Sequence, residues 1–226
     1  MGTDILPGHS YVDGEFVSGP SLTDHVGEAT IKSSFYSSKS AKDPVVLTDE
    51  LLVRDTVADA YRKVSLATLQ GLMVGPGGVV QTSYAEYTAN SNITTVIPPD
   101  DTIPQNTEGT EILAAAITPK FSTSRILVQF QGWGSMSVGP LQFIASLFRD
   151  AAANALSAAY STNDAVAGGI AGAVIVYQDS PSSTSLLTYR VRVGLQSAGT
   201  LRLNGTSTAR FFGGIAKSTL ILQEIK

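Results

Sequence analysis

Cysteine is absent from the 226-residue sequence, which excludes disulfide bonds, thiolate nucleophiles and cysteine-ligated metal sites. Histidine is nearly absent, since only His9 and His25 occur. A Ser-His-acid triad would need one of these two residues, and the glycine-rich segment at residues 132–137 lacks the G-x-S-x-G spacing of a nucleophile elbow. The sequence therefore gives no support to hydrolytic catalysis.

Other chemical signatures are missing as well. The glycine-rich stretches contain no Walker lysine, and no G-x-G-x-x-G motif opens a helix, so neither phosphate-binding motif is present. Asp100 and Asp101 are sequence neighbours in a loop-like context, whereas a glycosidase needs two carboxyl groups facing each other across a cleft. Clustered metal ligands and the EF-hand spacing are also missing. We therefore expect a protein that is not an enzyme and has no cofactor or metal.

Charge is scarce in this sequence. Only 15% of the residues are charged while 43% are hydrophobic, and the formal net charge is -4. This composition provides no basic surface for nucleic acid or for an anionic membrane. The longest apolar run, residues 165–177, is too short to span a bilayer, so we expect no membrane insertion and a buried strand after a glycine-rich bend. A surface with so little charge indicates that part of it is covered by partners.

Residues 1–78 are rich in turn formers and interrupted in pattern. We expect an irregular arm that attaches the chain to a partner, because such segments seldom bury enough apolar area to fold alone. Within it, residues 51–55 and 61–64 predict a small hairpin, and Ser65 is a plausible N-cap for a short helix. The Gly-Pro-Gly-Gly cluster at residues 75–78 is a linker signal, which predicts a second domain over residues 79–226.

Residues 79–226 have the texture of an all-β domain. Short runs rich in Val, Ile, Tyr and Phe alternate with Gly, Ser, Asn and Pro, which predicts an antiparallel β-sandwich of the jelly-roll kind. The alanine-rich segment at residues 151–159 is expected to form a loop and a short strand. No heptad pattern occurs, so no coiled-coil shaft is encoded. The predicted strands lie at residues 79–89, 112–117, 125–130, 142–149, 174–177, 186–193, 200–203 and 218–226.

The last of these strands is apolar on both faces. Leu220 and Leu222 share one face with Glu224, and Ile221 and Ile225 share the other. Antiparallel strands with one solvated face alternate more cleanly, so we expect protein on both sides of this strand, either a second sheet or another subunit. Leu220, Ile221, Leu222 and Ile225 are therefore the candidate residues of the core or of a subunit interface.

Trp133 is the only tryptophan and stands between Gly132 and Gly134. Two interpretations remain open for it. A single tryptophan near a strand end is typical of a core or interface residue. Alternatively, an indole exposed by flanking glycines would provide a stacking surface for a sugar, as in a carbohydrate-binding module.

Several segments of the β domain occur in a suggestive order. They are Ile-Thr-Pro at residues 117–119, Ser-Thr-Ser-Arg-Ile-Leu-Val at 122–128, Leu-Phe-Arg-Asp at 147–150, Asp-Ser-Pro at 179–181 with Leu-Thr-Tyr-Arg-Val at 187–191, and the terminal strand. As an ordered set, this resembles the C-terminal domain common in tailed-bacteriophage fibre and virion-surface proteins, whose jelly roll is similar to that of the tumour necrosis factor group. Residues 49–66 also resemble a short module found near the N-termini of phage tail and fibre proteins.

The resemblance implies a homotrimer whose inner sheets surround a threefold axis. It further implies a place in the virion, assembled in the host cytoplasm, with residues 1–78 bound to other virion proteins and the jelly roll free to bind a host-surface glycan or receptor. Because a long shaft is missing, a short tail, neck or head fibre is favoured, with a capsid decoration protein and a carbohydrate-binding module as alternatives. The loops at residues 90–109 and 151–169 are candidate contacts, since loops carry recognition on rigid β scaffolds.

Overall fold

The computed structural model describes residues 11–12, 15–16, 50–55, 60–66, 69, 74–163 and 167–226. The chain forms two compact units, Met1–Asp49 and Glu50–Lys226. In the first unit, β1 (Tyr11–Val12) pairs with β2 (Glu15–Phe16). The expected irregular course of the arm lies otherwise outside the described residues.

The second unit begins with the predicted hairpin. Strand β3 (Glu50–Asp55) pairs antiparallel with β4 (Ala60–Ser65), which confirms the prediction made from residues 51–64. Most of the short helix expected after Ser65 lies outside the described residues. Within the described residues, no helix is both long and apolar enough to cross a membrane.

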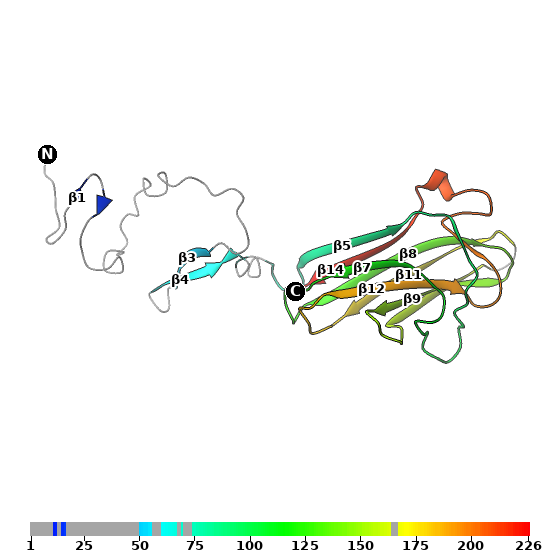
Figure 1. Cartoon of the computed structure of the whole chain (residues 1–226), viewed down its shortest axis with the longest axis horizontal. Coiled ribbons are helices and arrows are strands. Elements are labelled where there is room, and N and C mark those ends of the chain that lie inside the picture. Colours follow the sequence, from blue (N-terminus) through cyan, green and yellow to red (C-terminus); the bar gives the residue numbers. More distant parts are fainter. Residues whose placement is uncertain are drawn as a thin grey trace. The chain divides into compact units, whose positions relative to one another are not determined.

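The rest of the second unit is a sandwich of two antiparallel sheets (Figure 1). The first sheet has the strand order β5–β14–β8–β11, and the short strands β13 and β6 extend it beside the far end of β8. Its strands are β5 (Val79–Tyr87), β14 (Ser218–Ile225), β8 (Arg125–Met136), β11 (Ile170–Asp179), β13 (Leu201–Leu203) and β6 (Ser91–Ile93). The second sheet has the order β7–β12–β9–β10, with strands β7 (Thr110–Ile117), β12 (Leu187–Leu195), β9 (Leu141–Arg149) and β10 (Ser157–Asn163).

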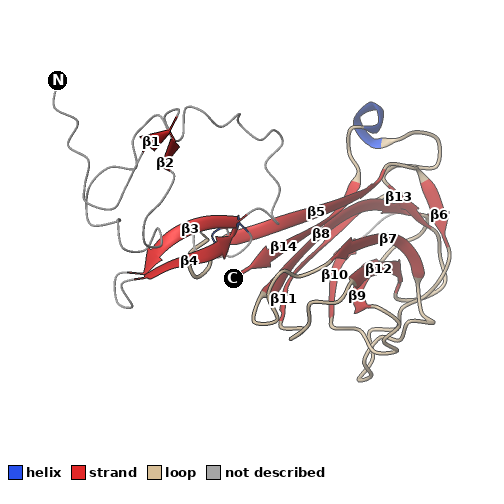
Figure 2. Ribbon diagram, turned by 60° about the vertical axis from the view of Figure 1, so that its left-hand side comes forward, coloured by secondary structure: helices blue, strands red, loops and turns tan. Residues whose placement is uncertain are grey.

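The path of the chain through these sheets is that of a jelly roll. Of the long strands, only β9 and β10 follow each other within one sheet; every other step along the chain crosses to the opposite sheet (Figure 2). Eight long strands in two antiparallel sheets with such crossings define the jelly-roll arrangement. The predicted fold class is therefore confirmed, including the loop and short strand within the alanine-rich segment.

The core lies between the two sheets and follows the alternation of each strand. Its largest fully buried side chains include Phe130 on β8, Phe143 on β9 and Tyr189 on β12. Side chains of this size each contribute roughly 1.5–3 kcal/mol when removed from water. One strand departs from expectation: β11 is not buried on both faces, since Val174 and Val176 are 56% and 67% exposed. The apolar run at residues 165–177 gave no sign of this, because both of its faces are apolar.

Candidate functional site

The outer face of the β5–β14–β8–β11 sheet is largely uncharged and apolar. The strand register aligns its side chains in rows, for example Tyr84, Ile221, Gln129 and Val176 across the four strands. We call this surface the outer sheet face. Its outward positions include Thr82, Tyr84, Glu86, Thr219, Ile221, Gln223, Ile225, Arg125, Leu127, Gln129, Gln131, Trp133, Ile170, Val174, Val176 and Gln178.

Charge occurs on the outer sheet face only toward its ends. Glu86 lies at the end of β5 and pairs with Lys217. The Tyr84 hydroxyl donates a hydrogen bond to the same carboxylate at 2.8 Å. These two hydrogen bonds, from Lys217 first and Tyr84 second, hold the pKa of Glu86 below its ordinary value. Between Glu86 and Arg125 the face presents apolar, glutamine and threonine side chains, which is the composition of a surface that another protein can cover.

The four candidate residues of the terminal strand divide between the two sides of this sheet. Leu220 and Leu222 point inward and are fully buried in the core. Ile221 and Ile225 point outward and are partly exposed on the outer sheet face. The two-sided apolar pattern thus reflects one core face and one outer face of the same strand.

Trp133 lies on the outer sheet face and is 43% exposed. Its ring rests across Gly172 of the neighbouring strand β11, where a Cβ atom would come within 2.5 Å of the ring. Gly132 and Gly134 are buried, and added Cβ atoms there would collide with Phe130 and Leu201. The flanking glycines therefore leave room for side chains of the core. The glycine that leaves room for the indole is Gly172 on the neighbouring strand β11.

The residues that carry the sequence resemblance gather at one end of the sandwich, the end marked by the C-terminus in Figure 1. There the buried Asp179 Oδ2 accepts hydrogen bonds from Arg149 Nη1 and from the Tyr189 hydroxyl, each at 2.6 Å. Burial, followed by this hydrogen bond to Asp179, strongly raises the pKa of Tyr189. The cluster joins β11 of one sheet to β9 and β12 of the other.

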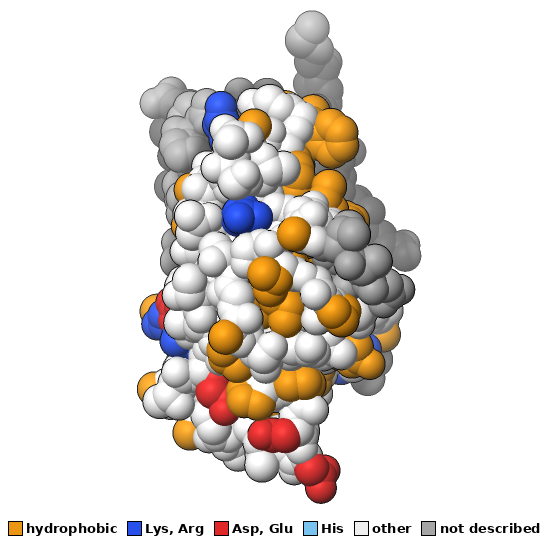
Figure 3. Space-filling model, turned by 90° about the vertical axis from the view of Figure 1, so that its right-hand side faces the viewer, with side chains coloured by type: hydrophobic (Ala, Val, Ile, Leu, Met, Phe, Trp, Pro, Cys, Tyr) orange, Lys and Arg blue, Asp and Glu red, His pale blue; other side chains and the backbone are white. Residues whose placement is uncertain are grey.

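A second polar cluster lies at the same end. Glu224 of the terminal strand is fully buried, and its carboxylate accepts hydrogen bonds from Gln81 Nε2 at 2.6 Å and from the backbone amides of Lys120 and Phe121 at 2.8 and 3.2 Å. The turn before β8 is thereby attached to β14 and β5. We call the hydrogen-bonded clusters around Asp179 and Glu224 the two clamps, because they join the strands of the motif segments at this end of the sandwich. The opposite end, seen in Figure 3, shows mostly apolar and uncharged side chains with acidic ones gathered toward one margin.

Over β9, the outer face of the second sheet is covered by the chain's own loops, whereas Tyr160 on the neighbouring edge strand β10 is 64% exposed. Residues 94–109 and 150–156 are joined by hydrogen bonds from Ala155 N to Pro104 O at 2.9 Å and from Asn106 N to Ala153 O at 2.8 Å. Beneath this layer, Ile144 and Phe148 on the outward side of β9 are buried. The sequence pointed to loops 90–109 and 151–169 separately, and the structure brings parts of the two together.

Beside these joined loops lies a hollow of about 520 Å³. We call it the loop hollow; it is lined by Asn106, Glu111, Phe148, Asp150, Ala151, Thr188, Arg190 and Arg192. Glu111 accepts a hydrogen bond from Arg190 Nη1 at 2.8 Å and lies 3.8 Å from Arg192 Nη1. Asn106 and Ala151 belong to the loops named as candidates from the sequence, whereas sequence reasoning missed Glu111, Arg190 and Arg192, because no local pattern connects β7 with β12.

A protruding turn is the other feature that sequence reasoning missed. Between β13 and β14, the short 3-10 helix η2 (Phe211–Gly214) carries Phe212, 82% exposed, and Ile215, 81% exposed, follows it (Figure 2). The base is fixed by the fully buried Asn204, which donates from Nδ2 to the carbonyl oxygens of Tyr87 and Ala89. In the sequence, the two phenylalanines followed by two glycines at residues 211–214 could have indicated an exposed aromatic turn.

Comparisons with known proteins give only distant structural similarities. No protein-family model matches the sequence, and no curated protein is significantly similar to it. A structure of Eiger TNF from S. frugiperda is 10% identical with a TM-score of 0.37, and the match covers 64% of this chain and 92% of that one. A chain of the infectious bursal disease virus Gx strain is 9% identical with a TM-score of 0.33, over 79% of this chain and 42% of the other. Murine APRIL is 11% identical with a TM-score of 0.26, over 60% and 99%. The jelly-roll assignment rests on the strand order alone.

Within the part of the chain that the structure describes, no cluster of three or more His, Asp or Glu side chains could hold a metal ion. The two sheets instead offer two kinds of surface. One is a broad, uncharged face suited to a protein partner, and the other is a small polar hollow beside joined loops.

Proposed function

We propose that this chain is a non-enzymatic structural protein of a tailed-bacteriophage virion, namely a short tail, neck or head fibre. In this proposal, residues 1–78 attach it to other virion proteins. The jelly roll assembles as a homotrimer in which the outer sheet faces surround the threefold axis. The remaining surface is displayed outward for binding to the host surface.

The observation that carries the proposal is the outer sheet face. Tyr84, Val174 and Val176 are each more than half exposed there, in rows that run across all four strands. Burial of apolar area contributes roughly 25 cal/mol per Å² before the costs of association are subtracted. Exposed apolar side chains gathered on one sheet face, among glutamine and threonine, mark a surface that another protein can cover, so a second copy of the same face is a fitting cover.

The location of the motif segments supports the phage assignment. Arg149, Asp179, Tyr189 and Glu224 all belong to segments that resemble virion-surface proteins, and all four act in the clamps at one end of the sandwich. Segments with no role in common would not be expected to converge in this way. The residues of the resemblance therefore share a structural role, which is to join the strands at one end of the sandwich.

The mass of the full chain in solution tests the assembly. We expect light scattering at micromolar concentration to give three chains per particle. A monomer at this concentration would contradict the proposal. The copy number per virion then separates a fibre from the alternative of a capsid decoration protein, because a few trimers indicate a tail or neck and tens to hundreds indicate the capsid.

A carbohydrate-binding module is the second candidate, and the exposure of Trp133 is the observation that favours it. The indole packs against Gly172 and is 43% exposed, so the side away from Gly172 is available for stacking. In a trimer built on the outer sheet face, however, the same side would be covered. Loss of glycan binding in Trp133→Ala with the mass unchanged would favour the module, whereas loss of the trimer would favour the interface role.

A further inference from the structure

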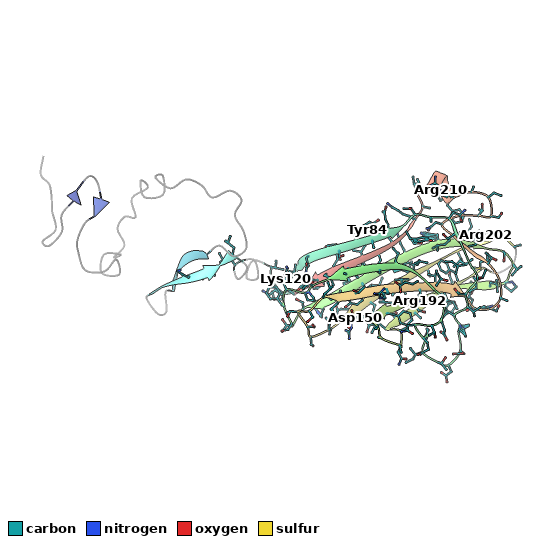
Figure 4. The ribbon with its side chains drawn as sticks, in the orientation of Figure 1. Tyr84, Lys120, Asp150, Arg192, Arg202 and Arg210 are labelled. Atoms are coloured by element: carbon teal, nitrogen blue, oxygen red, sulfur yellow. The ribbon has the colours of Figure 1, made fainter. Side chains whose placement is uncertain are left out.

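The loop hollow is built on fixed side chains. Arg192 donates from Nε to the Glu108 carbonyl at 2.7 Å and from Nη2 to the Gly109 carbonyl at 2.9 Å. Asp150 accepts the Thr188 amide through Oδ1 at 2.8 Å, and Asp150 N donates to Thr188 O at 2.7 Å. Figure 4 labels Asp150 and Arg192, which lie on the same layer of the sandwich. Because both residues are held by the backbone, the lining is preorganised for a ligand.

The charges of the hollow are balanced. Arg190 and Arg192 both face Glu111, and Asp150 is a second carboxylate in the lining. Two guanidinium groups and two carboxylates sum to zero net charge. A charged ligand would therefore find no excess of the opposite sign, whereas a neutral ligand would keep these pairs intact.

Several polar atoms of the lining remain open. In the described structure, the Thr188 hydroxyl, Asn106 Oδ1 and Asp150 Oδ2 take part in no hydrogen bond within the protein, although the same residues are fixed by other atoms. Arg190 uses only Nη1. The lining thus offers a hydroxyl, two acceptors and guanidinium donors around the exposed Ala151, with Phe148 buried beneath them. Alternating donors and acceptors around a small apolar area match the hydroxyl groups and the C–H face of a sugar.

We propose that the loop hollow binds a neutral, hydroxyl-rich saccharide. Its volume of about 520 Å³ lies within the usual range for small-molecule sites. Asp150 Oδ2 and Asn106 Oδ1 accept from sugar hydroxyls, and Arg190 and the Thr188 hydroxyl donate to sugar oxygens. This proposal rests on the proposed host-surface role and specifies its ligand class. It is independent of Trp133, which lies on the other sheet.

The test uses the full chain and saturation-transfer NMR. The probes are galactose, glucose and N-acetylglucosamine, with N-acetylneuraminic acid as the charged comparison. Ala151→Trp fills the hollow without removing a hydrogen bond made by a side chain, and Ala152→Trp, one residue further along and outside the lining, is the matched control. We expect at least one neutral sugar to bind, binding to fall about tenfold or more in Ala151→Trp, and binding to persist in Ala152→Trp.

Thr188→Val keeps the proposal testable if Ala151→Trp fails to fold. It removes only the open hydroxyl and retains the shape of the side chain and its backbone hydrogen bonds. The expected loss of affinity is about threefold to tenfold. The proposal is overturned if no neutral sugar binds, if only the charged sugar binds, or if Trp133→Ala abolishes the signal while Ala151→Trp leaves it unchanged. Failure of the proposed trimer would appear separately, as a monomeric mass in a protein that still binds the sugar.

Discussion

The outer face of the β5–β14–β8–β11 sheet is exposed and uncharged over most of its area, whereas that of the β7–β12–β9–β10 sheet is covered over β9 by the loops at residues 94–109 and 150–156. In the first sheet, Val174 and Val176 stay exposed on outward positions. In the second, Ile144 and Phe148 occupy equivalent outward positions and are buried. The second sheet thus has a cover from the chain itself over β9, which the first sheet lacks over β11.

This difference also separates two kinds of recognition. A flat face without charge favours a partner of similar shape and a large contact area, such as another copy of the chain. A small hollow with fixed polar groups favours a small hydroxyl-rich ligand. Assembly and host binding would then be assigned to opposite faces of the sandwich, so that neither role obstructs the other.

The largest effect is expected where the terminal strand faces the core. Leu222→Asp places a carboxylate among fully buried side chains. We expect loss of folding, with a destabilisation of at least about 4 kcal/mol. Circular dichroism and solubility of the full chain measure it. Ile221→Asp on the outer side of the same strand is the matched control and should keep its fold while weakening assembly. A soluble, intact trimer of Leu222→Asp would contradict the position assigned to this strand.

The clamp around Glu224 should show a smaller effect. Glu224→Leu leaves the amides of Lys120 and Phe121 without their acceptor and removes one of the two acceptors of Gln81 Nε2, which should lower the free energy of unfolding by about 2–3 kcal/mol. Glu224→Gln keeps one acceptor oxygen and should lose only about 1 kcal/mol. Urea unfolding of both variants gives the comparison. Equal stability of the Leu and Gln variants would show that the hydrogen bonds to Glu224 do not support this end.

The clamp around Asp179 predicts that the stability of the fold depends on pH in the alkaline range. Burial and the hydrogen bond to Asp179 raise the pKa of Tyr189, so the unfolded chain loses this proton first, near its ordinary pKa of about 10. The stabilisation is fully present below that pH and declines as the pH rises further, by up to about 1.4 kcal/mol per pH unit. Tyr189→Phe should be less stable at pH 8 but decline less steeply between pH 10 and 11. Parallel slopes in urea unfolding at these pH values would contradict this account.

The smallest effect concerns the protruding turn. Phe212 has φ of 49° and ψ of 44°, a left-handed conformation that is costly for a residue with a side chain. Phe212→Gly relieves this strain but increases the freedom of the unfolded chain, so we expect a net stabilisation of about 0.5–1 kcal/mol. Ala216→Gly, outside the strained positions, should instead destabilise slightly. A stability loss in Phe212→Gly would mean that the aromatic ring packs within the protein.

The sequence predicted the sandwich because its strands are short, separated by turn formers and rich in β-branched residues. It also predicted protein on both sides of the terminal strand, and on one side Leu222 is buried in the core. It did not predict that Val174 and Val176 would be exposed, because a two-sided apolar strand has the same pattern whether its second face meets a sheet or solvent. That choice depends on strand order, which local patterns do not encode.

The loop hollow could not be read from the sequence for a related reason. Arg190, Glu111 and Asp150 come from three separate segments and meet only through the pairing of β12 with β7 and β9. The loops at residues 90–109 and 151–169 were predicted as recognition candidates because loops carry recognition on β scaffolds, but their joining through Pro104 and Ala155 is a long-range contact. Trp133 was noticed for its flanking glycines, yet the glycine beneath it, Gly172, is distant in sequence.

The mass of the full chain with Val176→Asp tests the central claim most directly. Val176 is 67% exposed at the β11 end of a row on the outer sheet face, so the substitution adds charge to the proposed interface without disturbing the core. Gln178→Asp, near the end of the same strand, serves as a milder comparison. Light scattering should give three 23.6 kDa chains for the wild type and a folded monomer for Val176→Asp. A monomeric wild type, or a Val176→Asp trimer of undiminished stability, would contradict the assignment of this face to assembly.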